Sequence, residues 1–82
     1  MASLQYVIDS LCSKLTVEQI YEVIQVQLKP GSLKIDEIIP SIRSKDRSLD
    51  YDSAKALIQT ALEEMAQRGD MKIDGDWIHP VA

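Results

Sequence analysis

The stretch that most constrains the fold of this chain is residues 50–70, which has the pattern of one long amphipathic helix with both ends marked. Asp50 is a good helix-capping residue, and Gly69 can take the left-handed conformation that ends a helix. Between them, apolar residues recur at three- and four-residue steps and form one stripe: Ala54, Leu57, Ile58, Ala61, Leu62, Met65 and Ala66. We therefore expect the other elements to pack against this stripe.

The segment after this helix predicts a tight hairpin. Two short apolar runs, residues 71–73 and 77–79, flank Asp74-Gly75-Asp76, and Asp-Gly between such runs is a strong hairpin signal. Trp77 lies in the second run. Because the chain has few aromatic residues with which to fill a core, we expect Trp77 to be buried; if it is exposed, it is the best candidate anchor for a protein partner.

The N-terminal part of the chain predicts two helices. Residues 2–15 carry an apolar stripe at helical spacing, and Cys12, beside that stripe, is expected to be a small packing residue of the core. Thr16 and Gln19 fit a capping box, in which each side chain bonds the other residue's backbone amide. A second helix is therefore expected from Val17 to Leu28, before a Pro-Gly turn pair.

The middle of the chain predicts a short strand, a short helix and an exposed connection. Residues 32–35 alternate polar and apolar side chains, as a strand does. A helix capped by Asp36 is expected over Ile38 to Arg43, and Pro40, which lacks a backbone donor, confines its regular start to that neighbourhood. Residues 44–48 contain no apolar side chain, so we expect them to be exposed.

Composition limits the class of protein. The 82 residues suffice for one domain with a small core, and 45% apolar with 27% charged residues is typical of a globular protein. No apolar run approaches the ~20 residues of a membrane span, and Asp9 and Ser10 interrupt the N-terminal segment that a signal sequence would need. We therefore expect an intracellular protein with no membrane partner. A single cysteine and a single histidine favour neither a disulfide nor a metal, and no cofactor is expected.

From residue 16 onward the expected order is helix, short strand, short helix, longer helix and hairpin. Over residues 16–82 this order resembles the winged helix-turn-helix superfamily, with residues 51–68 as the recognition helix and residues 71–79 as the wing. The resemblance implies an α+β winged-helix domain: a three-helix unit with a short two- to three-stranded antiparallel sheet. Residues 1–15 would be an added helix, which either caps the core or, through residues 2–15, pairs with a second subunit in a homodimer.

The charge pattern bears on what such a domain binds. DNA-reading members of the superfamily surround the recognition helix with basic residues. Here the polar face of residues 51–68 carries more acids than bases: Asp52, Glu63 and Glu64 against Lys55 and Arg68. The hairpin region adds Asp70, Asp74 and Asp76. This pattern favours a non-enzymatic protein-interaction or assembly module over a nucleic-acid-binding protein.

Two sets of candidate site residues follow from these two interpretations. The interaction module would use Gln59, Glu63, Gln67 and Trp77. The alternative, a small DNA-binding transcription regulator, would place Arg43, Lys45, Arg47 and Lys55 on phosphates and Gln59 on an adenine edge. Because Asp46 interrupts the basic cluster, the cluster also has the composition of a solvated loop. An enzyme is not expected, since the chain offers no nucleophile with its base, no glycine-rich phosphate loop and no metal cluster.

Overall fold

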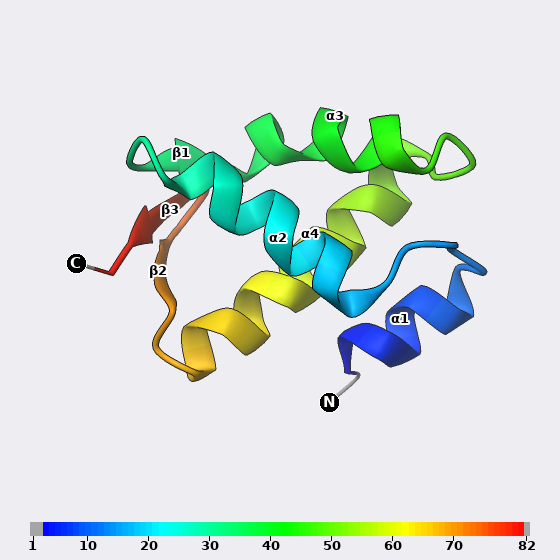
Figure 1. The fold of residues 1–82 in the computed structure, drawn as a ribbon, viewed down its shortest axis with the longest axis horizontal. Coiled ribbons are helices and arrows are strands. Elements are labelled where there is room, and N and C mark those ends of the chain that lie inside the picture. Colours follow the sequence, from blue (N-terminus) through cyan, green and yellow to red (C-terminus); the bar gives the residue numbers. More distant parts are fainter. Residues whose placement is uncertain (1–2, 82) are drawn as a thin grey trace.

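The helix expected over residues 50–70 forms, and the rest of the chain packs around it (Figure 1). The computed structural model describes residues 3–81. Within that range the chain has four helices and a three-stranded antiparallel sheet, so the predicted α+β class is confirmed. The elements are α1 (Leu4–Ser10), α2 (Val17–Leu28), β1 (Leu33–Lys34), α3 (Ile35–Lys45), α4 (Tyr51–Gln67), β2 (Met71–Asp74) and β3 (Trp77–Pro80). This order is consistent with a winged-helix-like layout preceded by one additional helix.

Both ends of α4 are capped as the sequence predicts. Asp50 accepts a hydrogen bond from the backbone N–H of Ser53 at 2.7 Å. At the other end, the N–H groups of Gly69 and Asp70 bond back to the last turn at 3.0 and 2.9 Å, which is the Schellman pattern. Gly69 has φ 81°, the left-handed conformation this pattern needs. The expected stripe of α4 is buried except for Ala66, which is half-buried.

Helix α3 is longer than the sequence suggests and starts earlier. The expected start near Pro40 is wrong: the helix begins at Ile35, where the backbone N–H of Lys34 donates to Glu37 at 3.1 Å. Asp36, the expected cap, lies in the first turn instead. The helix continues across Pro40 because it buries four isoleucines, each contributing about 2 kcal/mol, against a cost of about 3 kcal/mol for an interior proline. These are Ile35, Ile38, Ile39 and Ile42.

Helix α1 is shorter than the expected residues 2–15 and ends at Ser10. Cys12 has φ 53°, so the chain leaves the helical conformation there, and its side chain is exposed. The expectation that Cys12 packs in the core is therefore wrong. Leu4 and Ile8 of α1 are buried in the same core as the α4 stripe, and Leu15 joins them from outside any helix. Residues 1 and 2 of the expected helix lie outside the described residues.

The sheet has the order β1-β3-β2, with β3 in the centre. Ile78 of β3 lies opposite Leu33 on one side and Ile73 on the other, while Trp77 lies opposite Lys34 and Asp74. The hairpin turn is the two residues Gly75 and Asp76, and Gly75 has φ 60°, as the first position of a type II′ turn requires. The expected hairpin is thus confirmed. The strand expected over 32–35 is shorter, because α3 begins at Ile35.

The two faces of the sheet differ in character. Directly opposed residues of antiparallel strands point to the same face, so Leu33, Ile73 and Ile78 share the face that Met71 also occupies. Met71, Leu33 and Ile78 are buried there against the helices. The opposite face points away from them. We call it the outer sheet face, and it consists of Lys34, Lys72, Asp74, Trp77 and His79.

Candidate functional site

Trp77 lies on the outer sheet face, and the expectation that it fills the core is wrong. The residue is 43% exposed. Its neighbour Ile78 is fully buried on the inner face, and because successive strand residues point to opposite faces, Trp77 must point outward. Within residues 3–81 the buried hydrophobic core consists of leucine, isoleucine, valine, alanine and methionine. The sequence makes Trp77 the candidate anchor for a protein partner if it is exposed, and it is exposed.

Two rows of side chains form the outer sheet face around Trp77. In the first row Trp77 lies between Lys34 of β1 and Asp74 of β2. The Lys34 ammonium is 5.5 Å from the centroid of the indole ring, within cation–π range. The second row pairs Lys72 with His79, whose Nε2 is 4.0 Å from Asp74 Oδ2. The face therefore presents one large aromatic ring among charged side chains, with lysines in both rows.

The other three candidate residues for protein interaction lie on a different surface. Gln59, Glu63 and Gln67 are exposed and four residues apart, so they form one line along α4. Helix α4 packs against the inner face of the sheet, whereas Trp77 lies on the outer face and points toward solvent. The structure therefore does not bring Trp77 together with the α4 line. Use of that line by a partner stays a prediction.

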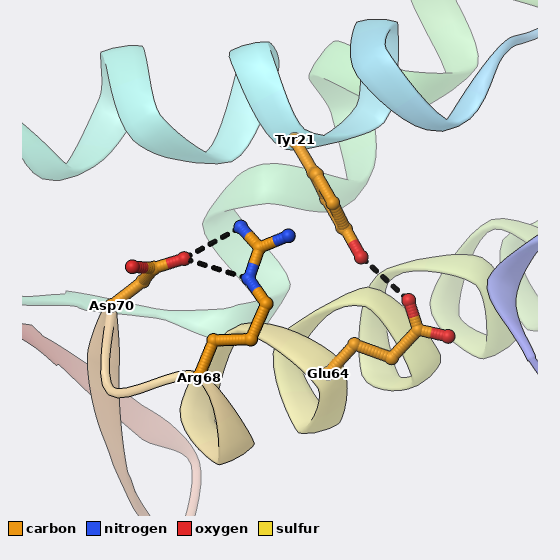
Figure 2. A network of polar contacts seen from close by, with 4 residues as sticks. All are labelled: Tyr21, Glu64, Arg68 and Asp70. Carbon is orange, nitrogen blue, oxygen red and sulfur yellow. Dashed lines mark hydrogen bonds and ion pairs between the residues drawn. The ribbon is translucent and has the colours of Figure 1, made fainter.

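Glu64, which the sequence places on the acidic polar face of α4, joins three helices. Its Oε1 accepts a hydrogen bond at 2.7 Å from the N–H of Leu4 in the first turn of α1. Its Oε2 accepts one at 2.5 Å from the hydroxyl of Tyr21 on α2 (Figure 2). Burial, and then the hydrogen bond to Glu64, raise the pKa of Tyr21 to about 12. Glu64 therefore has a structural role, which helical periodicity alone did not reveal.

Arg68 completes this arrangement at the end of α4. Its guanidinium lies 5.0 Å from the ring centroid of Tyr21 and donates two hydrogen bonds to Asp70 Oδ2, at 3.1 Å from Nε and 2.6 Å from Nη2 (Figure 2). Both hydrogen bonds to Asp70 raise the pKa of Arg68. Since Glu64 and Arg68 both bind within the chain, the charge that α4 offers to a partner comes mainly from Glu63, Asp52 and Lys55.

The basic residues proposed for DNA separate into different places. Arg43 and Arg47 line one hollow of about 470 Å³, together with the exposed ring of Tyr51. Lys45 lines another hollow, of about 460 Å³, between α2 and α3. Lys55 is half-buried on α4 and lines neither hollow. The structure thus brings together two of the four expected phosphate-binding residues.

Asp46 is not part of a solvated loop, and the expectation that residues 44–48 are all exposed is wrong. Asp46 is 2% exposed. Its Oδ1 accepts bonds from the hydroxyl and N–H of Ser48 at 2.6 and 3.1 Å, and its Oδ2 accepts bonds from the Ser13 hydroxyl at 2.8 Å and the Lys14 N–H at 3.3 Å. These hydrogen bonds, those of Ser48 and Ser13 first, lower the pKa of Asp46 to about 2. Ser48 is two residues away, but Ser13 and Lys14 lie more than thirty residues away in the chain, so no local pattern could have identified this link between two connections.

Comparisons with protein-family models, with curated proteins and with solved structures each returned no match. Across residues 3–81 no helix is both long and apolar enough to cross a bilayer. The same residues contain no group of three or more histidine, cysteine, aspartate or glutamate side chains placed to hold a metal ion. The outer sheet face around Trp77 and the hollow lined by Arg43 and Arg47 are candidate sites of this structure.

Proposed function

We propose that this chain is a non-enzymatic protein-interaction module that docks a partner on the outer sheet face, with Trp77 as the anchor. The observation that carries the proposal is the 43% exposure of the chain's single tryptophan on a face pointing away from the core. Tryptophan is among the residues most enriched at the energetic centres of protein interfaces. Aliphatic and methionine side chains fill the core, so the indole is not needed for packing there. Binding of a partner would explain its position on the surface.

The neighbours of Trp77 define the chemistry of that partner. Lys34 and Asp74 flank the ring, Lys72 lies in the neighbouring row, and Asp74 is the one carboxylate of the outer sheet face. A complementary segment presents an apolar or aromatic side chain to the indole and carboxylates to the two lysines. Truncation of an anchor of this kind typically costs about 2 kcal/mol or more of binding free energy, which lowers affinity about thirtyfold.

The test is affinity capture from the source cells with quantitative mass spectrometry, using the wild type, Trp77→Ala and Tyr6→Ala as baits. Tyr6 is the matched control because it is a 64% exposed aromatic residue on α1, away from the outer sheet face. We expect at least one protein to be captured equally by the wild type and by Tyr6→Ala. The same protein should not be captured by Trp77→Ala. Purified, that protein should shift the wild-type tryptophan fluorescence. If every captured protein is retained by Trp77→Ala, the proposal is wrong.

A second candidate function, DNA binding, is favoured by one observation. Arg43 and Arg47 line the same hollow beside the start of α4, which is the place for contacts to a phosphate backbone in a helix-turn-helix arrangement. Asp36 also lines that hollow and accepts a hydrogen bond from Tyr51 at 2.9 Å, which reduces the positive field there. We therefore place this function second.

Fluorescence anisotropy with random-sequence duplex DNA distinguishes the two functions. A DNA-binding protein should bind at about 50 mM salt and weaken by orders of magnitude at about 200 mM. In that case Arg43→Ala and Arg47→Ala should each weaken binding similarly across sequences, while Lys29→Ala, an exposed lysine beyond α2, should not. Absence of binding at about 50 mM salt would exclude this candidate.

A further inference from the structure

Among residues 3–81, no strand pairs with the outer edge of β2. β3 is paired on both sides, whereas β2 forms one boundary of the three-stranded sheet. Lys72, Ile73 and Asp74 are all exposed, and Ile73 is 41% exposed although it belongs to the inner face. An edge strand that presents an apolar residue and unpaired backbone groups is a template for pairing with another chain.

The hydrogen-bond pattern shows which backbone groups face outward. The N–H of Ile35 donates to the carbonyl of Asp76 at 2.9 Å, so the backbone groups of Asp76 and Ile78 face β1 and those of Trp77 and His79 face β2. Trp77 lies opposite Asp74, so the N–H and C=O of Asp74 are used within the hairpin. The groups of Ile73, one residue away, therefore point out from the edge.

These outward groups allow only a few ways for two β2 strands to meet about a twofold axis. Ile73 must face an outward residue of the second copy, which leaves antiparallel registers centred on Lys72, Ile73 or Asp74. A register centred on Lys72 places the two Lys72 side chains directly opposite each other. A register centred on Asp74 does the same with the two Asp74 side chains. Centring on Ile73 places each Lys72 opposite Asp74 of the second copy and the two Ile73 side chains against each other. Only this register is complementary in both charge and hydrophobicity.

We propose that two copies of this chain dimerise through antiparallel pairing of β2 with β2, centred on Ile73. The two three-stranded sheets then form one continuous sheet, with both Trp77 rings on the same outer face. The inference goes beyond the function proposed above, which needs only one copy. It also places the dimer contact away from residues 2–15, where Leu4 and Ile8 already pack in the chain's own core. The contact involves few residues, so the dimer belongs to the weak class of interfaces.

Charge exchange at Lys72 and Asp74 tests the register by sedimentation equilibrium at chain concentrations up to about 1 mM, the range suited to so small an interface. The wild type should dimerise. Lys72→Asp and Asp74→Lys should each be monomeric, because each places like charges opposite one another. The double variant Lys72→Asp/Asp74→Lys should recover dimerisation. Mixing the two single variants should give a 1:1 heterodimer. Lys72→Asp carries aspartates at positions 72 and 74, and Asp74→Lys carries lysines at both, so the two edges are complementary in charge.

A second measurement uses the unaltered chain and does not depend on how the variants fold. The amide of Ile73 should exchange with solvent rapidly at about 20 µM protein and about threefold more slowly at about 1 mM, as mass action allows for a weak dimer, whereas the amide of Lys72, bonded within the hairpin, should change little. A wild type that stays monomeric at about 1 mM, or single variants that dimerise as well as the wild type, would overturn the proposal. Capture of a partner through Trp77 is measured separately, so failure of the dimer leaves that function intact.

Discussion

One buried carboxylate, Asp46, links two connections that lie far apart in the chain. It accepts hydrogen bonds from Ser48 in the connection between α3 and α4, and from Ser13 and Lys14 in the connection between α1 and α2. These partners hold the carboxylate in its charged form. The N-terminal segment is therefore attached to the helical unit at two points: here and at Glu64, which binds the start of α1.

The stability of the chain should depend on pH through Asp46. Its pKa is about 2 in the folded protein, below its ordinary value of 3.8. A lowered folded-state pKa means that the contribution is present above about pH 4 and is lost as the pH falls toward 2. In urea unfolding at pH 6, 4 and 3, the wild type should be more stable than Asp46→Asn at pH 6, and this advantage should shrink at pH 3.

Glu63→Gln is the control, because it makes the same change from carboxylate to amide at an exposed position of α4. Over the same pH range, the difference between the wild type and Glu63→Gln should change less than the difference between the wild type and Asp46→Asn. An advantage of the wild type over Asp46→Asn that is as large at pH 3 as at pH 6 would show that the carboxylate charge is not what stabilises this junction.

At the scale of elements, the end of α4 is set by backbone conformation alone. Gly69 has φ 81°, and a Cβ built on it would meet no atom within 4 Å. Substitution by alanine therefore adds no clash but forces an L-residue into the left-handed region. We expect Gly69→Ala to lower the free energy of unfolding by about 1 kcal/mol in urea denaturation.

Gly69→Asn separates this cause from any other effect of a side chain at the position. Asparagine tolerates the left-handed conformation better than alanine does, so it should cost less despite being larger. If asparagine costs as much as alanine or more, backbone strain is not the reason for glycine here.

The elements that the sequence predicts well are those whose signals are local. The stripe, the cap at Asp50 and the stop at Gly69 lie within α4 or next to it, and Asp74-Gly75 determines the hairpin turn. The boundaries of α1 and α3 depend on distant contacts, so their predictions are wrong. α1 ends before Ser13, which bonds to Asp46 instead of continuing the helix. No periodicity in residues 2–15 contains that information.

The candidate site was predictable in part. The sequence identifies Trp77 as one of few large side chains but not the side of β3 to which it points. Trp77 points outward because its neighbour Ile78 is buried on the inner face. Ile78 is buried there because β3 lies between β1 and β2 in the sheet. Likewise, the charges of Arg43 and Lys45 are visible in the sequence, but their separation into different hollows depends on how α2 and α3 pack.

At the scale of the whole molecule, the sheet joins the two halves of the chain. β1 pairs with β3, although α3 and α4 lie between them in sequence, whereas β2 and β3 are joined by a two-residue turn. Contacts between distant residues require a large loop to close, so the pairing of β1 should form after the helices and the hairpin. We therefore expect the sheet to form in two steps, with the hairpin first and β1 second.

Leu33→Ala tests this order. Leu33 is 7% exposed in β1, and its truncation should lower stability by about 2 kcal/mol. If β1 joins late, nearly all of that loss appears as faster unfolding, and the refolding rate changes less than about twofold. Stopped-flow kinetics followed by Trp77 fluorescence measure both rates. The comparison variant is Ile58→Ala in the centre of α4, which should slow refolding. If Leu33→Ala slows refolding in proportion to the stability it loses, β1 does not pair late.

If β1 pairs last, the chain passes through a form in which one side of β3 is still unpaired. Until β1 arrives, β3 offers the backbone groups that Leu33 will later bond, and β1 of another molecule can occupy that place just as well. Such an exchange of arms is a domain swap, with the junction between β1 and α3 at residues 34–35 as its hinge. Refolding from concentrated solution should therefore trap exchanged pairs that refolding from dilute solution avoids, and these pairs should separate only on unfolding.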